Sequence, residues 1–422
     1  MAYRDTKKTD LTLPLLVIAF VLLGVMGAAR VVGLAPSDND LAQPFIKATT
    51  RAGSPLRQAV DYLWGKQAED GGWHSEKYGL LRSGQALTPF ILHSLLMVPE
   101  EVHPRSSDAV NRALAFIRRH TDERGVLGVA DPDVLEYPNY ATAYALRCLE
   151  LVGAEQDREL VERMRAYLKA EQFTETRGIQ PQSLAFGGWG FGGRQRFGET
   201  GHMDIAHTRR VLQALRETES EVEDAEVSWR AEQFLGGMQR LPSDPRPQPK
   251  SPDANVQFSL ANRTSDNYDG GFYFSPVVLA ANKGREARNE QGEPIGFRSY
   301  ATSTCDGVLC LLACGVKPDD QRLRDATTWL AKHQNLDYPE GVPRDHPEPW
   351  GDAIHFYHLA ARAEVNRRLE WPGEWRSEIE QLLAGDQRAD GSFVNERSHL
   401  MKEDDPYLCT ALALIALTNS AR

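Results

Sequence analysis

The stretch YLWGKQAEDGGW, from Tyr62 to Trp73, decides the fold, because the chain repeats its parts six times. In each copy an aromatic residue or a leucine is followed by an aliphatic residue and, four positions further on, usually by Gln. The copies begin at Tyr62, Phe116, Tyr167, Phe234, Trp329 and Leu382, and the second has Thr121 in place of Gln. Self-similarity on this scale indicates a repeat architecture.

A second phrase follows each copy of the first. It is a Thr with aliphatic residues four and seven positions later, and it starts at Thr88, Thr142, Thr208, Thr304 and Thr410. In the fifth unit His355 stands at the Thr position. Because these places share one stripe of a helix, we expect them to meet neighbouring helices in an equivalent way in every unit.

Each unit is predicted to be a hairpin of two helices. The first helix is charged on one face, as in residues 323–333, and the second is apolar on most sides, as in residues 411–417. The first should therefore be an outer helix and the second an inner, buried one. An open array would leave apolar ends that need caps, and neither end of this array is polar. We therefore predict an all-α fold, an (α/α)6 toroid of six helical hairpins.

Glycine–aromatic turns connect the two helices, as in Asp70-Gly71-Gly72-Trp73. Glycine permits the tight turn, the aromatic plugs between outer helices, and Gln can bond exposed backbone groups nearby. Long inserts at residues 174–200 and 241–298 interrupt the third and fourth units. A loop of this length inside a compact domain is usually functional or disordered, and we expect both inserts to roof the mouth of the toroid.

These phrases carry a family resemblance. The aromatic–Leu–x3–Gln phrase followed by Asp-Gly-x-Trp resembles the QW repeat of squalene and oxidosqualene cyclases. The implied toroid is similar to that of protein prenyltransferase β subunits, and the resemblance covers the domain at residues 55–422. It implies a terpenoid cyclase-type toroid that binds an isoprenoid or other apolar ligand in a central cavity.

The acid of such cyclases can be sought residue by residue. Class II cyclases use an Asp-x-Asp-Asp-Thr segment whose middle Asp protonates the alkene. The matching segment here is Asp204-Ile205-Ala206-His207-Thr208. Ala206 stands at the protonating position, so the acid motif is not kept, and whether the chain is an enzyme stays open. Asp204 and His207 are retained as catalytic candidates.

The resemblance to prenyltransferases suggests a zinc site. Those enzymes hold zinc with an Asp and a Cys on one inner helix and a His on the next, and zinc lowers the pKa of the acceptor thiol. Cys305, Asp306 and His355 are the matching candidates, although the order of Cys and Asp is reversed and shifted. Asp352, His355 and His358 form a second candidate set, for acid–base chemistry or a metal.

The N-terminal segment differs from the rest. Residues 11–29 carry no charge, and 19 residues at helical rise nearly cross a hydrocarbon core of roughly 30 Å. We predict a cytoplasmic tail at residues 1–10, a transmembrane anchor at 11–32 and a linker at 33–54. Arg4, Lys7 and Lys8 precede the run, which places the toroid on the extracytoplasmic side. A cleaved signal peptide is the alternative.

Charge narrows the function classes. The net charge is −11, and no basic patch is present, which disfavours a nucleic-acid partner. Three functions therefore remain: an apolar-ligand toroid of the cyclase or prenyltransferase type, a non-catalytic protein-interaction scaffold on the same fold, and a zinc-dependent prenyltransferase with altered ligands.

Overall fold

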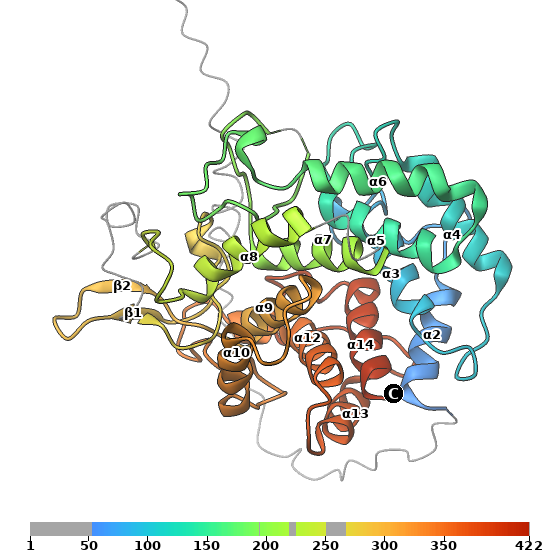
Figure 1. Cartoon of the computed structure of the whole chain (residues 1–422). Helices are drawn as coiled ribbons and strands as arrows, with labels where there is room; N and C mark the ends of the chain where they lie inside the picture. Colours follow the sequence, from blue (N-terminus) through green and yellow to red (C-terminus); the bar gives the residue numbers. More distant parts are fainter. Residues whose placement is uncertain (1–52, 194, 219–224, 250–266, 422) are drawn as a thin grey trace, which may run out of the picture. The chain divides into compact units, whose positions relative to one another are not determined.

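The computed structural model describes residues 53–193, 195–218, 225–249 and 267–421 (Figure 1). Six outer helices carry the first phrase: α2 (Pro55–Gly65), α4 (Ser107–His120), α6 (Arg158–Ala170), α8 (Ala225–Gln239), α10 (Gln321–Lys332) and α13 (Trp375–Asp386). Six inner helices carry the second: α3 (Leu87–Leu96), α5 (Pro138–Val152), α7 (Ile205–Thr218), α9 (Ala301–Ala313), α12 (His355–Arg368) and α14 (Pro406–Ser420). Outer and inner helices alternate along the chain, as predicted.

Shorter elements complete the described part. A single-turn helix, α11 (Trp350–Ala353), precedes α12, and strands β1 (Glu286–Arg288) and β2 (Pro294–Phe297) form an antiparallel hairpin in the second insert. Short 3-10 turns lie at Gly79–Leu81, Glu155–Asp157, Glu175–Arg177 and Leu279–Ala281.

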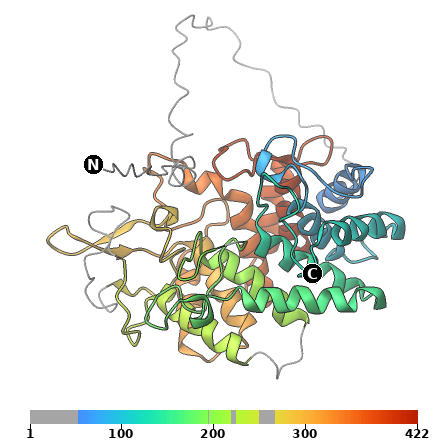
Figure 2. The same ribbon diagram turned by 90° about the horizontal axis from the view of Figure 1, so that it is seen from above.

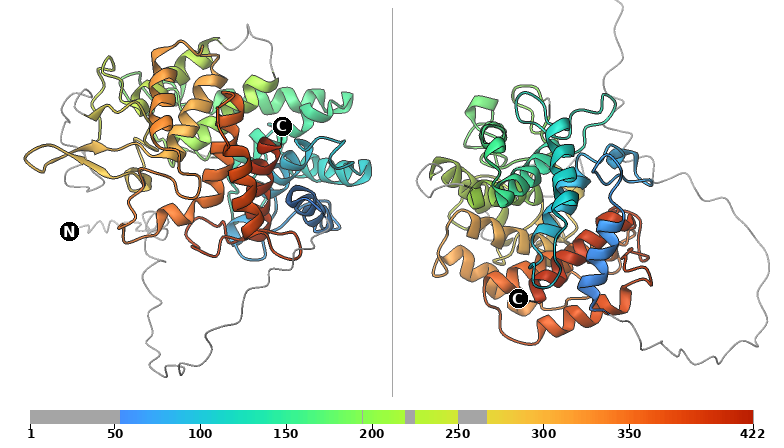
Figure 3. Two further views of the ribbon diagram at one scale, coloured as in Figure 1. Left: turned by 90° about the horizontal axis from the view of Figure 1, so that it is seen from below. Right: turned by 90° about the vertical axis from the view of Figure 1, so that its right-hand side faces the viewer.

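The inner helices form a closed ring. Each contacts the next in the order α3, α5, α7, α9, α12, α14, and α14 returns to α3. The first outer helix, α2, contacts both α13 and α14, so the first and last units lie side by side (Figure 2, Figure 3). The predicted (α/α)6 toroid-like arrangement is therefore present.

Burial divides the two sets of helices as their composition predicts. Every residue of α3 is buried, whereas α6 buries only Leu160, Val161, Met164 and Leu168. These four lie on one stripe of α6, and its charged side chains face water. The inner helices therefore form the core and the outer helices shield it.

The repeated threonines hold the turns onto the inner helices. The backbone N–H of the residue at the aromatic position of each turn donates to the threonine Oγ1 of the same unit, at 2.9 to 3.1 Å. The pairs are Trp73–Thr88, Leu127–Thr142, Trp189–Thr208, Phe272–Thr304 and Phe393–Thr410. In the fifth unit His355 replaces threonine, and its Nδ1 donates instead to the carbonyl of Asp337 at 2.9 Å.

The repeated glutamines join each unit to the next. One Nε2 group donates both to the turn of its own unit and to the first residues of the following outer helix. The pairs of acceptors are Gly71 and Ala109 for Gln67, Gly187 and Val227 for Gln172, Gly270 and Arg322 for Gln239, and Gly391 and Pro55 for Gln387. The last pair joins the sixth unit to the first.

The turn glycines make this close approach possible. Gly391 has a φ of +89°, and a Cβ there would lie 2.4 Å from the carbonyl oxygen of Gln58 in α2. Any side chain would both strain the backbone and push the first outer helix away. Glycine at this position therefore permits the sixth turn to pack on the first unit.

The predicted membrane anchor precedes the described residues. Among the described residues no helix combines the length and the apolarity that spanning a bilayer needs. The tail at 1–10, the anchor at 11–32 and nearly all of the linker lie outside the described residues.

We call the contact of Gln387 with Gly391 of the sixth turn and Pro55 of the first outer helix the seam. Gln387→Ala is expected to lower the free energy of unfolding by about 1–3 kcal/mol, because the two carbonyl groups at the seam lose their shared donor. Urea denaturation of the purified chain measures this change. Gln334→Ala is the matched control, since Gln334 has the same place in the repeat but is exposed, and in the described part of the chain its side chain donates to Ala331 at the end of α10 and not to another unit. Its effect should stay within about 0.5 kcal/mol. Equal losses in both variants would contradict a special role for the seam.

Candidate functional site

The two inserts meet the N-terminal ends of inner helices α5 and α7. Gly190 pairs with Met203 in an antiparallel bridge, and the N–H of Asn139 at the start of α5 donates to the carbonyl of Phe191 at 3.0 Å. The N–H of Ile205 donates to the carbonyl of Phe274, also at 3.0 Å. We call these helix ends, with residues 190–193, 202–204 and 274–283, the mouth of the toroid.

Two of the predicted site residues form a dyad at the mouth. Asp204 precedes α7, is 1% exposed and accepts the backbone N–H of His207 at 2.8 Å. The Nδ1 of the His207 ring lies 2.9 and 3.0 Å from the two carboxylate oxygens of Asp204. Burial alone would raise the pKa of Asp204, but the ring and backbone N–H of His207 hold that pKa below its ordinary value. Asp204 is therefore an ionised partner for the imidazole.

Aromatic side chains surround the His207 ring. Ring centroids lie 4.6 Å away for Phe191 and 6.2 Å for both Tyr137 and Tyr140. The Nε2 atom of His207 is buried and has no hydrogen-bond partner among the described residues. This nitrogen is therefore unpaired in a largely aromatic environment.

Tyr137 holds its place in this group at a cost in backbone energy. Its φ is +47°, in the left-handed region, although the residue before a proline normally adopts an extended conformation. Such strain persists only where the surrounding structure imposes it, and it concentrates at functional sites. The strained backbone stacks the Tyr137 ring on the imidazole of His207.

His355 and His358 lie elsewhere. Both are fully buried and bond the fifth turn: His355 through the carbonyl of Asp337, and His358 through the carbonyl of Asn335 at 3.0 Å. Burial lowers the pKa of His358 to about 3, so its ring is neutral. Asp352, the third member of the predicted set, accepts the side-chain N–H of Asn395 through its backbone carbonyl. These contacts are those of a structural turn.

The zinc candidates do not converge. Burial raises the pKa of the Cys305 thiol to about 11, and Asp306 faces Arg209 and Tyr357 in the middle of the ring. His355 bonds the fifth turn instead. In the described part of the chain, no three side chains of His, Cys, Asp or Glu are grouped closely enough to hold a metal ion.

A network of charged groups occupies the axis of the toroid. Arg209 of α7 donates to Asp306 of α9 at 2.7 Å and to Glu364 of α12. Tyr357 donates to the same Asp306, and Gln213 donates to Glu364 at 2.5 Å. Arg209 and Asp306 are each only 1% exposed. The axis is therefore bridged by charged side chains, where the sequence predicted an apolar central cavity.

Sequence reasoning missed one residue of the mouth. Lys283 lies in the aperiodic second insert, is 7% exposed, and places its ammonium 4.8 Å from the Phe274 ring centroid and 5.3 Å from that of Trp350. Burial lowers its pKa to about 8, although Asp204 and Asp306 act in the opposite direction. This segment has no periodic pattern, and Trp350, one of the aromatic residues that contact Lys283, is far from it in the sequence. The sequence therefore holds no signal for this residue.

Comparison with known proteins supports the fold. A variant of the type II terpene cyclase MstE from Scytonema, in complex with its substrate geranylgeranyl dihydroxybenzoate, is similar with a TM-score of 0.52. It is 14% identical over 87% of this chain and 96% of its own. A ligand-free variant, also 14% identical, gives a TM-score of 0.50 over 87% and 94%. These matches confirm the predicted terpenoid cyclase-like fold, and identity this low speaks to the fold alone.

A second class of solved structure is similar at a lower level. An α-1,6-mannanase from Salegentibacter is similar with a TM-score of 0.48 and 11% identity over 87% of this chain and 97% of its own, which is too weak to carry an argument. The sequence matches no known family, and no curated protein is detectably similar to it.

Lys283→Met is expected to remove a pH dependence of stability. The folded-state pKa of Lys283 is about 8 and its ordinary value is 10.5, so between these pH values the unfolded chain binds a proton that the folded chain does not. The free energy of unfolding of the wild type should therefore rise with pH across this window. The gain in stability from Lys283→Met should be largest near pH 7 and shrink toward pH 10.5. Urea denaturation of both proteins at each pH tests this, and a constant difference would refute it.

Proposed function

We propose that the toroid binds an apolar, isoprenoid-type ligand at its mouth and that His207 and Asp204 act on it as an acid–base pair. The observation that carries this proposal is the open Nε2 of His207, buried among aromatic rings while Nδ1 is bonded to a buried carboxylate. The terpenoid cyclase-like fold is consistent with an apolar ligand but does not by itself argue for one.

The dyad is suited to accept a proton. A carboxylate partner fixes Nδ1 as the protonated nitrogen, which leaves the Nε2 lone pair free. A hydroxyl or an acidified C–H of the ligand would give its proton to Nε2, and Asp204 would stabilise the imidazolium that forms. Proton return to the ligand or to water restores the neutral ring.

Alkene protonation does not suit these residues. Initiating polyene cyclisation needs a carboxylic acid held protonated in a dry pocket. Ala206 stands at that position of the motif, and Asp204 beside it is held ionised by His207. A base-driven step therefore fits the site better than a cyclisation of the class II type.

The position of the ligand follows from space along the axis. The cavity found on the axis has a volume of about 40 Å³, whereas ligand pockets usually offer roughly 300–1,000 Å³. An isoprenoid chain of 20 carbons does not fit there. We therefore place the ligand at the mouth, against Phe191, Tyr137 and Tyr140, rather than inside the ring.

A protein-interaction scaffold is the second candidate, and the filled axis favours it. Leu135 and Phe197, beside the mouth and in the first insert, are 52% and 78% exposed. Exposed apolar side chains of this kind can contact a partner protein. In this case the inserts would be the contact surface and His207 a buried core residue.

We also propose that residues 11–32 anchor the chain in a membrane with the toroid on the extracytoplasmic side. The support is the uncharged run at residues 11–29 behind three basic residues. The chain should stay with membranes during alkaline carbonate extraction and be digested by protease added to the extracytoplasmic face. Release by carbonate would rule out the anchor.

Geranylgeranial tests the acid–base proposal, because its conjugated carbonyl acidifies the γ-hydrogens. The full chain in lipid nanodiscs, incubated with this aldehyde in D2O, is expected to exchange those hydrogens for deuterium, as measured by mass spectrometry. His207→Asn keeps a side-chain donor near Asp204 but has no ring Nε2, and it should lower the exchange rate by about 10²-fold or more.

The control is His399→Asn. His399 makes the same Nδ1 contact with Asp404 at 2.9 Å, but its side chain is 74% exposed and it neighbours Tyr78 of the first unit rather than α5 or α7. This variant should exchange at the wild-type rate. A diazirine analogue of geranylgeraniol should in addition label residues 137–140 or 190–207. Absence of labelling there would favour the scaffold, and exchange that survives His207→Asn would refute the role of the dyad.

A further inference from the structure

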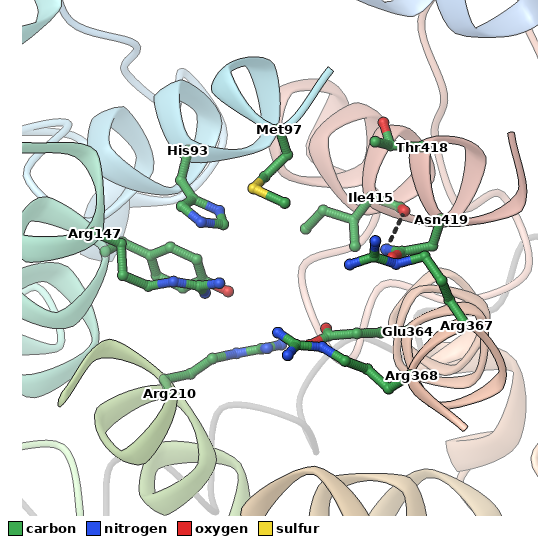
Figure 4. A pocket seen from close by; sticks show the side chains of 11 residues that line it. His93, Met97, Arg147, Arg210, Glu364, Arg367, Arg368, Ile415, Thr418 and Asn419 are labelled. Atoms are coloured by element: carbon green, nitrogen blue, oxygen red, sulfur yellow. Dashed lines mark hydrogen bonds between the residues drawn. The ribbon is translucent and has the colours of Figure 1, made fainter. Parts of the chain in front are cut away.

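The small polar cavity on the axis lies at the end opposite the mouth. It is enclosed by the C-terminal ends of α3, α5, α12 and α14 and by the middle of α7 (Figure 4). Its volume of about 40 Å³ has room for about three water molecules. An occupant of this cavity must therefore be small.

Basic side chains prevail in the described lining of the cavity. This lining contains Arg147, Arg210, Arg367 and Arg368 together with Glu364 (Figure 4), and Arg147, Arg367 and Arg368 each have further partners. Both oxygens of Glu364 already accept hydrogen bonds from α7: one from Arg209 and the other from Gln213 at 2.5 Å. Burial alone would raise the pKa of this carboxylate, but it also faces Arg210, Arg147 and Arg368, whose charges together with Arg209 hold that pKa below the ordinary value. One carboxylate is thus shared between the axis network and the cavity.

Arg210 is the central cation of the cavity. Its side chain is only 4% exposed, and its buried Nε has no hydrogen-bond partner among the described residues. Asp306 and Glu364 lie near enough for their carboxyl groups to respond to its charge, but no direct hydrogen bond or salt bridge joins either of them to Arg210 in the described part of the chain. Its guanidinium lies 5.7 Å from the Tyr144 ring centroid and 5.5 Å from that of Tyr357. These rings offset part of the cost of burying a cation, but a buried charge ordinarily requires a partner of opposite charge.

Two neutral donors face the same space. His93 is 4% exposed and Thr418 is 3% exposed. Within the described ranges, neither the ring nitrogens of His93 nor the Thr418 hydroxyl have a hydrogen-bond partner. Burial, together with Arg147 and Arg210, holds the pKa of His93 well below its ordinary value, so the neutral ring offers one N–H. Buried polar groups without partners are rare, and three around one cavity indicate a missing ligand.

We propose that this cavity binds a small tetrahedral oxyanion of the phosphate or sulfate type. A guanidinium fork gives two parallel hydrogen bonds to such an anion, and His93 and Thr418 supply further donors. Arg368 is exposed at the rim, where the anion would enter. The proposal is independent of the acid–base chemistry at the mouth, since the Arg209–Asp306 pair lies between the two sites.

Thermal unfolding of the full chain with inorganic phosphate tests this proposal. At constant ionic strength, made up with chloride, 10 mM phosphate or sulfate should raise Tm by several degrees, and calorimetric titration should give a Kd below about 1 mM. Methyl phosphate should bind comparably if a phosphate monoester is the occupant, and acetate should bind at least tenfold more weakly. A phosphate effect no larger than that of chloride would overturn the proposal.

Substitutions separate the site from general salt effects. Arg210→Met should raise Tm in buffer without oxyanions, because it removes a buried charge that has no direct ion pair among the described residues, and should abolish the gain from phosphate. His93→Phe keeps the packing on Tyr144 and should weaken phosphate binding about tenfold. Arg344→Met is the matched control, since Arg344 also stacks on a tyrosine but is exposed. An unchanged phosphate response in Arg210→Met or His93→Phe would refute the site.

Discussion

The seam at Gln387 is the interaction on which the toroid depends. One side-chain amide bonds the sixth turn through Gly391 and the first helix through Pro55, as Gln67, Gln172 and Gln239 do between consecutive units. The inner helices are apolar on most sides, so none of them can face water. Closure of the ring gives each inner helix a neighbour on both sides. The glutamines fix the distance between consecutive units, because each bonds the turn of one unit to the outer helix of the next.

Much of the fold could be predicted because residues at equivalent positions of the repeat make equivalent contacts in successive units. The threonine and glutamine positions were assigned from spacing alone, and five threonines bond their turns in the same way. The site was less predictable. Asp204 and His207 are close in sequence and form the expected pair, whereas Arg209, Asp306 and Glu364 meet only because three distant helices share one axis. Lys283 lies in a segment without periodicity, so no pattern could place it at the mouth.

The charged network divides the axis into two chemical environments. At the mouth, aromatic rings surround a histidine whose partner is a buried carboxylate. At the opposite end, the described lining of a small cavity contains four guanidinium groups and the Glu364 carboxylate. The Arg209 salt bridges fill the axis between the two ends, so the ends do not share one large chamber. Specificity at each end is therefore set by local side chains rather than by the shape of a shared chamber.

The seam also has a consequence for how the chain is made. Gln387 and Pro55 are 332 residues apart, so α2 and α3 are synthesised long before their partners α13 and α14 exist. Contacts this distant in sequence form slowly, and until they form the apolar sides of the first unit stay exposed. During most of translation, the nascent chain therefore exposes the apolar surface of α2 and α3 that later packs against α13 and α14. Because the ring closes only when the last unit has been made, the first unit must be protected from aggregation until then.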